Sequence, residues 1–316
     1  MRCARTFVLG LGAGGLALAF AGCSSIRWMP ETIVYAPNTY REVNPAEDPT
    51  PDELRRLGVD RQLRVPVGQP RISLAVWLLE PRRPLRGTIL VLHGVHGNKD
   101  SLLYMGHLLA DAGFRAVLVD LRGHGRSTGA WLTYGVRESA DLSELVDALA
   151  RQDLLAGCLG TFGISYGGAV AIQHAGRDAR VKAVVAVAPF ATMRSEVRHF
   201  VRRRTLFGPF LTEAKIDAAI DGAGRLADFD PDDASPVKAI TQTQAPVLLF
   251  HGGRDVKIPC QQSAQLHAAA PGHSELIIVA GADHDSISDA RASPVFTNAV
   301  AWFERQLPVS CPAAGK

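Results

Sequence analysis

The segment Phe162-Gly163-Ile164-Ser165-Tyr166-Gly167-Gly168 most constrains how this chain can fold. It reads G-x-S-x-G and stands between an apolar run, 158–162, and a small-residue helical pattern that starts at Ala169. Strand, sharp turn and helix in this order hold the central residue in a strained conformation with its side chain directed away from the sheet. We therefore expect the Ser165 hydroxyl to reach a substrate carbonyl. The alternative is an ordinary strand-to-helix turn without chemistry.

Apolar strand-like runs alternate with helical patterns along most of the chain. Strands are predicted at 62–67, 72–79, 88–93, 115–120, 158–162, 181–188, 247–251 and 275–280. Helices are predicted at 101–112, 139–151, 261–270 and 298–307, besides the helix that follows Ser165. Buried, β-branched strands separated by helices form a mostly parallel sheet that is covered on both faces. The fold class is therefore α/β, with eight strands.

The stretch from about 191 to 243 is longer than a single helix between two strands requires, so we expect a small helical lid over a pocket. Its first part is rich in arginine between Arg194 and Arg204. The basic cluster Arg198–Arg204 has two interpretations. It is either a solvated helix face or a surface that meets lipid headgroups or an anionic substrate.

The first 22 residues have the features of a secretory signal. Arg2 and Arg5 precede an apolar run at 7–20, which is shorter than the roughly 20 residues that span a bilayer. The sequence Phe20-Ala21-Gly22-Cys23 resembles a bacterial lipobox. This resemblance implies cleavage before Cys23, acylation of that cysteine and a lipid anchor in the cell envelope, with Ser24 favouring the outer membrane. A plain signal peptide and an uncleaved anchor are the alternatives.

Residues 23–60 are rich in proline and predict a lipidated tether with little regular structure, except for a short helix at 52–57 that Gly58 ends. The α/β domain is expected at 61–310, and residues 311–316 form a tail. Cys158, Cys260 and Cys311 remain after the signal, so at most one internal disulfide can form among them and its pairing is open. Cys158 is expected to be buried core.

The composition mainly excludes classes of protein. Hydrophobic residues make up 47% of the chain and charged residues 21%, as in an ordinary globular protein. The formal net charge of +3 gives no indication of nucleic-acid binding. The sequence shows no C-x-x-C pattern and no metal-ligand spacing, so we expect neither a metal nor a cofactor.

Two later loops carry the partners that a serine nucleophile needs. A serine hydroxyl becomes reactive when a histidine takes its proton, and a carboxylate orients that histidine. Asp255 follows the predicted strand at 247–251, and His284 follows the last strand. Both loops lie at the carboxyl edge of the sheet, where ligands bind. Asp283 and Asp285 flank His284, but adjacent residues rarely point the same way, so Asp255 is preferred.

The loop that follows the strand at 88–93 is expected to stabilise the negative charge of a tetrahedral intermediate. Two backbone amides aimed at the oxyanion are enough, and we assign them to Val95 and Tyr166. His93 is expected to brace this loop rather than act as the base. Asp120, at the end of another strand, is expected to tie the loop Arg122-Gly123-His124-Gly125.

Five segments in this order resemble the α/β-hydrolase fold family, most closely its Bem46-like and serine-aminopeptidase-like (S33) branch. The resemblance implies that Ser165 is the nucleophile, Asp255 the acid and His284 the base. The segments are Leu90-Val91-Leu92-His93-Gly94, Asp120-Leu121-Arg122-Gly123-His124-Gly125-Arg126-Ser127, Gly163-Ile164-Ser165-Tyr166-Gly167-Gly168, His251-Gly252-Gly253-Arg254-Asp255 and Gly281-Ala282-Asp283-His284.

We therefore expect a serine hydrolase that cleaves a carboxylic ester or thioester of a small-molecule or lipid-like substrate. The alternatives are a peptidase or aminopeptidase of the same fold, an acyltransferase, and a non-catalytic lipid-binding lipoprotein. An esterase is preferred because the sequence identifies no subsite for a free amino terminus.

Overall fold

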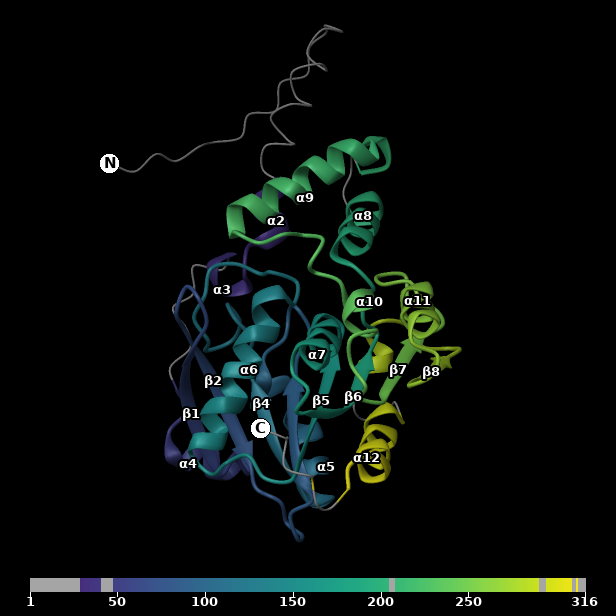
Figure 1. Cartoon of the computed structure of the whole chain (residues 1–316). Coiled ribbons are helices and arrows are strands. Elements are labelled where there is room, and N and C mark those ends of the chain that lie inside the picture. Colours follow the sequence, from purple (N-terminus) through teal and green to yellow (C-terminus); the bar gives the residue numbers. More distant parts are fainter. Residues whose placement is uncertain (1–28, 41–47, 205–207, 290–293, 309–310, 312–316) are drawn as a thin grey trace, which may run out of the picture.

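The structure is a computed structural model that describes residues 29–40, 48–204, 208–289, 294–308 and 311. Its centre is one eight-stranded sheet in the order β1-β2-β4-β3-β5-β6-β7-β8 (Figure 1). Strand β2 pairs antiparallel with β1 and β4, and the other pairs are parallel. The predicted fold class is therefore confirmed. The strands are β1 (Arg61–Val67), β2 (Ile72–Leu79), β3 (Gly87–Leu92), β4 (Phe114–Val119), β5 (Cys158–Ile164), β6 (Val181–Val187), β7 (Val247–Gly252) and β8 (Ser274–Val279).

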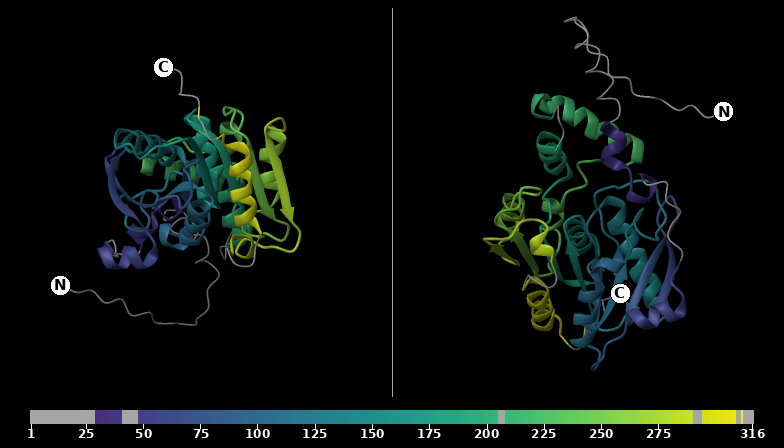
Figure 2. Two further views of the ribbon diagram at one scale, coloured as in Figure 1. Left: turned by 90° about the horizontal axis from the view of Figure 1, so that it is seen from below. Right: turned by 180° about the vertical axis from the view of Figure 1, so that it is seen from behind.

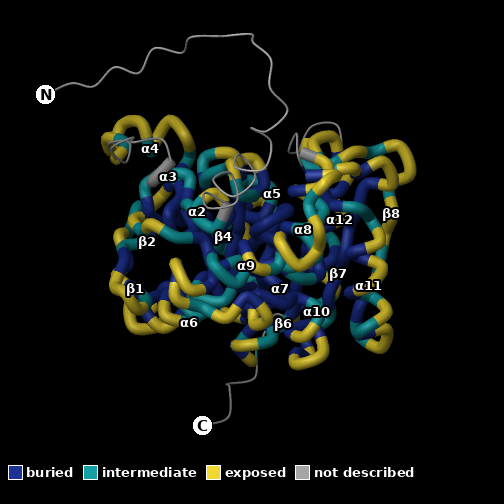
Figure 3. Tube along the Cα trace, turned by 90° about the horizontal axis from the view of Figure 1, so that it is seen from above, coloured by how far each residue is buried: buried dark blue, intermediate teal, exposed yellow. Residues whose placement is uncertain are grey.

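Helices cover both faces of the sheet because the strand side chains alternate between two cores (Figure 2). In β3, Leu90 and Leu92 belong to one core and Ile89 and Val91 to the other. The central strands are accordingly buried, whereas exposed residues gather on the outer helices and loops (Figure 3). The first core contains α6 (Val136–Arg151), α7 (Tyr166–Arg177) and α11 (Gln261–Ala269), and the second contains α5 (Leu103–Asp111) and α12 (Val295–Gln306).

The long insertion between β6 and β7 is helical, as predicted. It comprises α8 (Met193–Arg204), η2 (Gly208–Phe210), α9 (Glu213–Ala227) and α10 (Pro236–Ala239). Helices α8 and α9 lie beyond the carboxyl ends of the parallel strands, at one end of the molecule (Figure 1). We call these two helices, with η2, the lid.

Ion pairs join α8 to α9 in a regular ladder. Arginines four residues apart on α8 face acids four residues apart on α9, in antiparallel register. Two of the four arginines of the Arg198–Arg204 cluster, Arg198 and Arg202, therefore pair with the neighbouring helix, an arrangement that neither sequence-based interpretation included. The pairs are Arg194–Asp221 at 2.8 Å, Arg198–Asp217 at 2.7 Å and Arg202–Glu213 at 3.1 Å.

The prediction of an irregular tether over 23–60 is wrong for residues 29–40. Helix α2 (Met29–Val34) packs against α9, and Ile33 and Val34 are buried in the lid core. Tyr35 stacks on Trp131 with ring centroids 5.2 Å apart. A short helix α3 (Pro37–Tyr40) follows. Prolines and polar residues predict turns locally, but here burial against a helix nearly 200 residues later decides the structure.

Of the other N-terminal predictions, one is confirmed and the rest lie outside the described residues. The predicted helix at 52–57 is confirmed as α4 (Pro51–Leu57), which Gly58 ends in the left-handed conformation with φ of 69°. The predicted signal peptide and Cys23 lie outside the described residues. Within the described part of the chain, no helix combines the length and apolarity needed to cross a bilayer.

A disulfide joins Cys158, at the start of β5, to Cys311. The sequence left this pairing open and predicted only that Cys158 is buried in the core. Cys158 is indeed fully buried, but it also anchors residue 311, while Cys260 is a free thiol.

Candidate active site

Ser165 occupies a strained turn between β5 and α7. Its φ of 54° and ψ of −117° lie in a region that side chains rarely adopt. The conformation is held because the Ser165 amide donates to the Val187 carbonyl at 2.7 Å. A Cβ at Gly163 would overlap the Gly167 carbonyl, which explains why the turn needs glycine. The serine is only 8% exposed, and that exposure faces a cavity.

The structure brings Ser165, His284 and Asp255 into one chain of hydrogen bonds. Ser165 Oγ lies 3.0 Å from His284 Nε2. On the other side of the ring, His284 Nδ1 lies 2.6 Å from Asp255 Oδ2. The three side chains come from the β5–α7 turn and from the loops after β7 and β8. Nδ1 donates to the carboxylate, which leaves Nε2 free to accept the serine proton.

Asp255 is held as a carboxylate. Its Oδ1 accepts hydrogen bonds from the amides of Lys257 and Ile258, both at 2.9 Å. Burial acts to raise the pKa of Asp255, but hydrogen bonds from His251 and His284 outweigh burial and keep that pKa below its usual range.

The two acids that flank His284 are engaged elsewhere. Asp283 accepts the Ser286 amide at 2.8 Å, and Asp285 pairs with Lys257 Nζ at 2.6 Å. The geometry thus selects Asp255 as the partner of His284.

The two residues assigned to the oxyanion site, Val95 and Tyr166, both line the cavity beside Ser165. Each is fixed by a contact away from the cavity. The Val95 carbonyl lies 2.9 Å from His124 Nε2, and the Tyr166 hydroxyl donates to Glu138 at 2.9 Å. Glu138 is a buried acid that sequence reasoning missed; it also accepts the amides of Thr133 and Gly135, so it ties the start of α6 to the residue after Ser165.

His93 braces the loop after β3, as expected. Its Nε2 accepts the Leu121 amide at 3.0 Å, and its Nδ1 donates to the Gly94 carbonyl at 2.8 Å. Burial lowers the pKa of His93 to about 3, so the ring is neutral. With both nitrogens engaged, His93 is positioned to support the loop rather than to act as a base.

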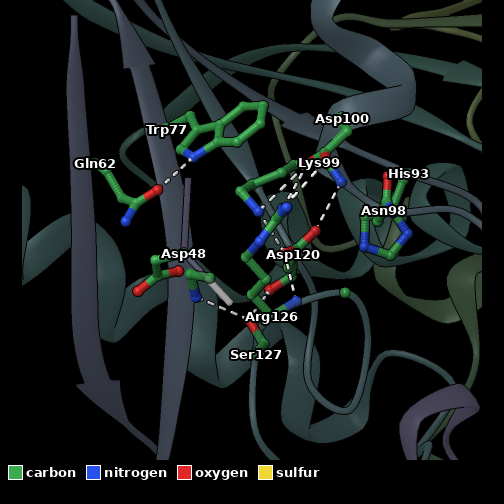
Figure 4. A network of polar contacts seen from close by, with 12 residues as sticks. Asp48, Gln62, Trp77, His93, Asn98, Lys99, Asp100, Asp120, Arg126 and Ser127 are labelled. Carbon is green, nitrogen blue, oxygen red and sulfur yellow. Dashed lines mark hydrogen bonds and ion pairs between the residues drawn. The ribbon is translucent and has the colours of Figure 1, made fainter. Parts of the chain in front are cut away.

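A buried ion pair between Lys99 and Asp120 also fixes the loop after β3 (Figure 4). Lys99 Nζ lies 2.6 Å from Asp120 Oδ2, and both side chains are fully buried. Asp120 also accepts the amides of Lys99 and Arg126, so it joins the loops after β3 and β4. The ammonium group lies 4.4 Å from the centroid of the Trp77 ring, a favourable cation–π distance. The expectation that Asp120 ties the loop after β4 is confirmed.

The cavity in front of Ser165 has a volume of about 560 Å³ and a mostly apolar wall. Its wall includes α2 and the residues after it, which sequence reasoning had placed in a tether. No local sequence signal could have placed them there, because their contacts are long-range. The lining residues are Thr32, Ile33, Tyr35, Pro37, Val95, His96, Leu132, Tyr134, Ser165, Tyr166, Phe190, Glu196, Val197, Phe200, Val201 and Ile258.

Glu196 is an acid on this apolar wall that sequence reasoning also missed. Gln262 Nε2 donates to it at 3.1 Å, and Gln262 is itself fixed by the Ala191 amide at 2.8 Å. Burial, helped by the charge of Asp255, raises the pKa of Glu196 to about 8 despite the hydrogen bond from Gln262. In the part of the chain that the structure describes, no group of three or more His, Cys, Asp or Glu could hold a metal ion.

The strand order explains why these residues meet. Chain crossovers run from β3 toward β4 and from β5 toward β6, in opposite directions along the sheet. The boundary between β3 and β5 is therefore a topological switch point, where loops diverge and leave a crevice. Val95 follows β3 and Ser165 follows β5, so both border this crevice.

This sheet, with its strained serine at the switch point, defines an α/β-hydrolase of the serine-hydrolase type. Residues 34–209 match the family model of the X-Pro dipeptidyl-peptidase (S15 family), and the chain belongs to that family. The sequence had pointed to the Bem46-like and S33 branch of the same fold.

One curated relative is similar in sequence, and two solved structures share the fold. YqkD of Bacillus subtilis is 31% identical over 202 residues, an alignment that covers 62% of this chain and 64% of YqkD. The chain thus spans less than two thirds of that relative. The Pyrococcus furiosus esterase Pf2001 superposes with a TM-score of 0.65 at 18% identity, covering 84% of this chain and 98% of the esterase. The Pyrococcus horikoshii acylaminoacyl peptidase gives 0.60 at 18% identity, covering 85% and 45%.

Proposed function

We propose that this protein is a serine hydrolase that cleaves a carboxylic ester or thioester through an acyl-enzyme. The observation that carries the proposal is the chain of hydrogen bonds from Ser165 through His284 to Asp255, at the wall of an apolar cavity. An aligned serine, histidine and carboxylate form the arrangement that activates a hydroxyl for attack on a carbonyl.

In the first half-reaction, Ser165 Oγ attacks the carbonyl carbon while His284 Nε2 takes the hydroxyl proton. Asp255 stabilises the resulting imidazolium, and the amides of Val95 and Tyr166 stabilise the oxyanion. The tetrahedral intermediate expels the alcohol or thiol, which receives the proton from His284. In the second half-reaction, His284 removes a proton from water, the hydroxide adds to the acyl carbon, and the carboxylic acid leaves as the proton returns to Ser165.

The cavity supports an acyl substrate. Its volume of about 560 Å³ lies within the usual range of small-molecule sites, and its wall offers few polar groups. Leu132, Phe190 and Ile258 are among the apolar side chains that would contact an acyl chain.

A second candidate, a peptidase that binds a substrate amine, has one observation in its favour. Glu196 is an acid without a basic partner among the contacts of the described residues, and it faces the same cavity as Ser165. An ammonium group of a substrate would favour the ionised form of this carboxyl. The esterase remains the first choice because the rest of the wall is apolar.

We further propose that Cys23 is acylated and anchors the protein in the bacterial envelope. The support is the sequence pattern before Cys23. Radiolabelled palmitate should label the full chain but not a Cys23→Ala variant. Equal labelling of both, or labelling of neither, would remove the proposal.

The decisive assay of activity is hydrolysis of p-nitrophenyl esters from acetate to palmitate by the chain from residue 24, with Ser165→Ala beside it. Ester turnover that depends on Ser165 supports the esterase, and the preferred chain length reports the depth of the cavity. Release of an amino-terminal residue from peptides without any ester turnover would favour the peptidase. Binding of lipid without reaction with a fluorophosphonate would favour the non-catalytic alternative, and transfer to an added alcohol would indicate an acyltransferase.

A further inference from the structure

The packing of α2 against α9 shortens the connection between Cys23 and the folded domain. Sequence alone gave a tether as far as residue 60, but residues 29–34 form helix α2, which packs against α9. Five residues separate Cys23 from Met29. A chain of this length reaches at most about 20 Å even when fully extended. An anchor at Cys23 would therefore hold the α2–α9 end of the molecule close to the bilayer.

The same end exposes aromatic side chains. Phe210, in η2, is 84% exposed, and Phe200, on α8, is 52% exposed. Helix α8 packs against η2, so both residues belong to one part of the lid. Exposed aromatic rings on one part of a lid are typical of surfaces that meet a membrane.

The charge of the lid is complementary to anionic lipid. From Met193 to Ala227 the chain has seven basic and four acidic residues. The arginines at 194, 198 and 202 pair with α9, as described above, whereas Arg203 is exposed and takes no part in the α8–α9 ladder. The net positive charge of the entire chain is no larger than that of this lid segment. Basic residues near an anionic bilayer are attracted to it, each by about 1 kcal/mol.

The cavity opens at this end as well. Its wall includes Ile33 and Tyr35 from the N-terminal segment and Phe200 and Val201 from α8. Phe200 lines the cavity and is half exposed, so it lies at the rim. A membrane against the lid would therefore lie in front of the entrance that leads to Ser165.

We propose that the α8–η2 face of the lid docks on the anionic bilayer that holds the acyl chains of Cys23, and that the cavity receives amphiphilic acyl esters from that bilayer. The orientation rests on the proposed acylation of Cys23, and the substrate class rests on the proposed hydrolase. Helix α4 lies toward the opposite end of the molecule from α9 in Figure 1, so the proposed orientation places it away from the membrane.

The orientation is testable with tryptophan fluorescence in vesicles of phosphatidylglycerol and phosphatidylcholine that carry brominated acyl chains. The acylated full chain is compared as Phe210→Trp and, as the matched control, Leu57→Trp on α4. Leu57 is 37% exposed, so both substitutions add a surface tryptophan whose emission is read after subtraction of the wild-type signal. Pro209→Trp, also at an exposed position, is a second reporter in case Phe210→Trp does not fold.

Brominated lipid should quench most of the added emission of Phe210→Trp and leave that of Leu57→Trp unchanged. Two results in palmitate-labelled protein would overturn the orientation. One is quenching of the added emission of Leu57→Trp, and the other is no quenching at either position. Absence of palmitate labelling would overturn it too, because the short connection would then lead to no anchor. Turnover of p-nitrophenyl acetate by the same preparations reports the proposed hydrolase separately, so failure of the orientation is distinguished from failure of the hydrolase.

Discussion

Arg198 and Asp217 face each other across the contact between α8 and α9, with Nη2 and Oδ1 2.7 Å apart. They form the middle rung of the ladder that continues through Arg194–Asp221 and Arg202–Glu213. Residues four apart lie on one face of a helix, so the spacing of these charges places the three arginines on one face of α8 and the three acids on one face of α9. The ladder matches the register in which the apolar faces of α8 and α9 pack.

Reversal of both charges of the Arg198–Asp217 pair should restore part of the stability that reversal of one charge removes. Arg198→Asp places like charges opposite each other and should lower the free energy of unfolding, and adding Asp217→Arg should recover part of the loss. Because both side chains are about a third exposed, we expect a coupling energy of only about 0.5–1 kcal/mol. Urea unfolding of the wild type, both single variants and the double variant measures it. Strictly additive effects would show that the pair is not coupled.

Replacement of the candidate nucleophile should abolish hydrolysis without unfolding the protein. Ser165→Ala is expected to lower kcat on p-nitrophenyl esters by about 10⁶, as in other serine hydrolases with this constellation. Ser143→Ala, on the partly exposed face of α6, is the control and should keep wild-type turnover. Full activity of Ser165→Ala, with an unchanged melting temperature, would refute the role of this serine.

The acid that orients His284 can be identified by comparing two aspartates. Asp255→Asn removes the carboxylate 2.6 Å from His284 Nδ1 and is expected to lower kcat by about 10⁴. Asp285→Asn only removes a surface contact with Lys257 and should leave kcat nearly unchanged. Steady-state kinetics on one ester decides between them. A larger loss in Asp285→Asn than in Asp255→Asn would reverse the assignment.

Glu196 should make stability depend on pH in the direction opposite to an ordinary surface acid. In the folded protein it keeps its proton up to about pH 8, whereas an unperturbed glutamate loses it near 4.5. Between these values the native state binds more protons than the unfolded state, so the free energy of unfolding falls as pH rises. Glu196→Gln removes this contribution. The variant should therefore gain stability relative to the wild type between pH 5 and pH 8.5, and parallel melting curves across this range would contradict the raised pKa.

Loss of the buried lysine should be costly because it leaves a charge uncompensated. Lys99→Met removes the only ammonium within 2.6 Å of Asp120 among the described residues, and such losses typically cost about 3–5 kcal/mol. Adding Asp120→Asn removes the unpaired buried carboxylate and should recover part of the lost free energy of unfolding. Urea unfolding of both variants tests the idea. A loss below about 1 kcal/mol for Lys99→Met would mean that Asp120 finds another partner or becomes protonated.

Much of the fold was predictable because its signals are local. The alternation of apolar strands with helices gives the sheet. Ser165 between Gly163 and Gly167 identifies the turn, because the tight turn leaves no room for side chains at the two glycine positions. The parallel sheet then gathers the loops that carry Asp255 and His284, since the carboxyl ends of its strands share one edge. The candidate site thus followed from motif order together with one topological rule.

The features that sequence reasoning missed all depend on contacts between distant segments. Proline-rich residues 29–40 become part of the cavity wall because α9 offers them an apolar surface. Glu196 faces the cavity because of the rotation of α8, which no local pattern determines. The register of the lid ladder likewise requires knowledge of how α8 and α9 pair, although the four-residue spacing of their charges was visible in the sequence.

The disulfide between Cys158 and Cys311 connects this architecture to the redox state of its surroundings. It joins residues 153 positions apart and ties the end of the described chain to the first residue of the strand that carries Ser165. Closing so long a loop restricts the unfolded chain, and such cross-links typically contribute about 2–5 kcal/mol. Disulfides persist in oxidising compartments and are rare in the reducing cytosol. With the export proposed from the N-terminal pattern, oxidation would cross-link the strand that precedes the nucleophile only after the chain has left the cytosol.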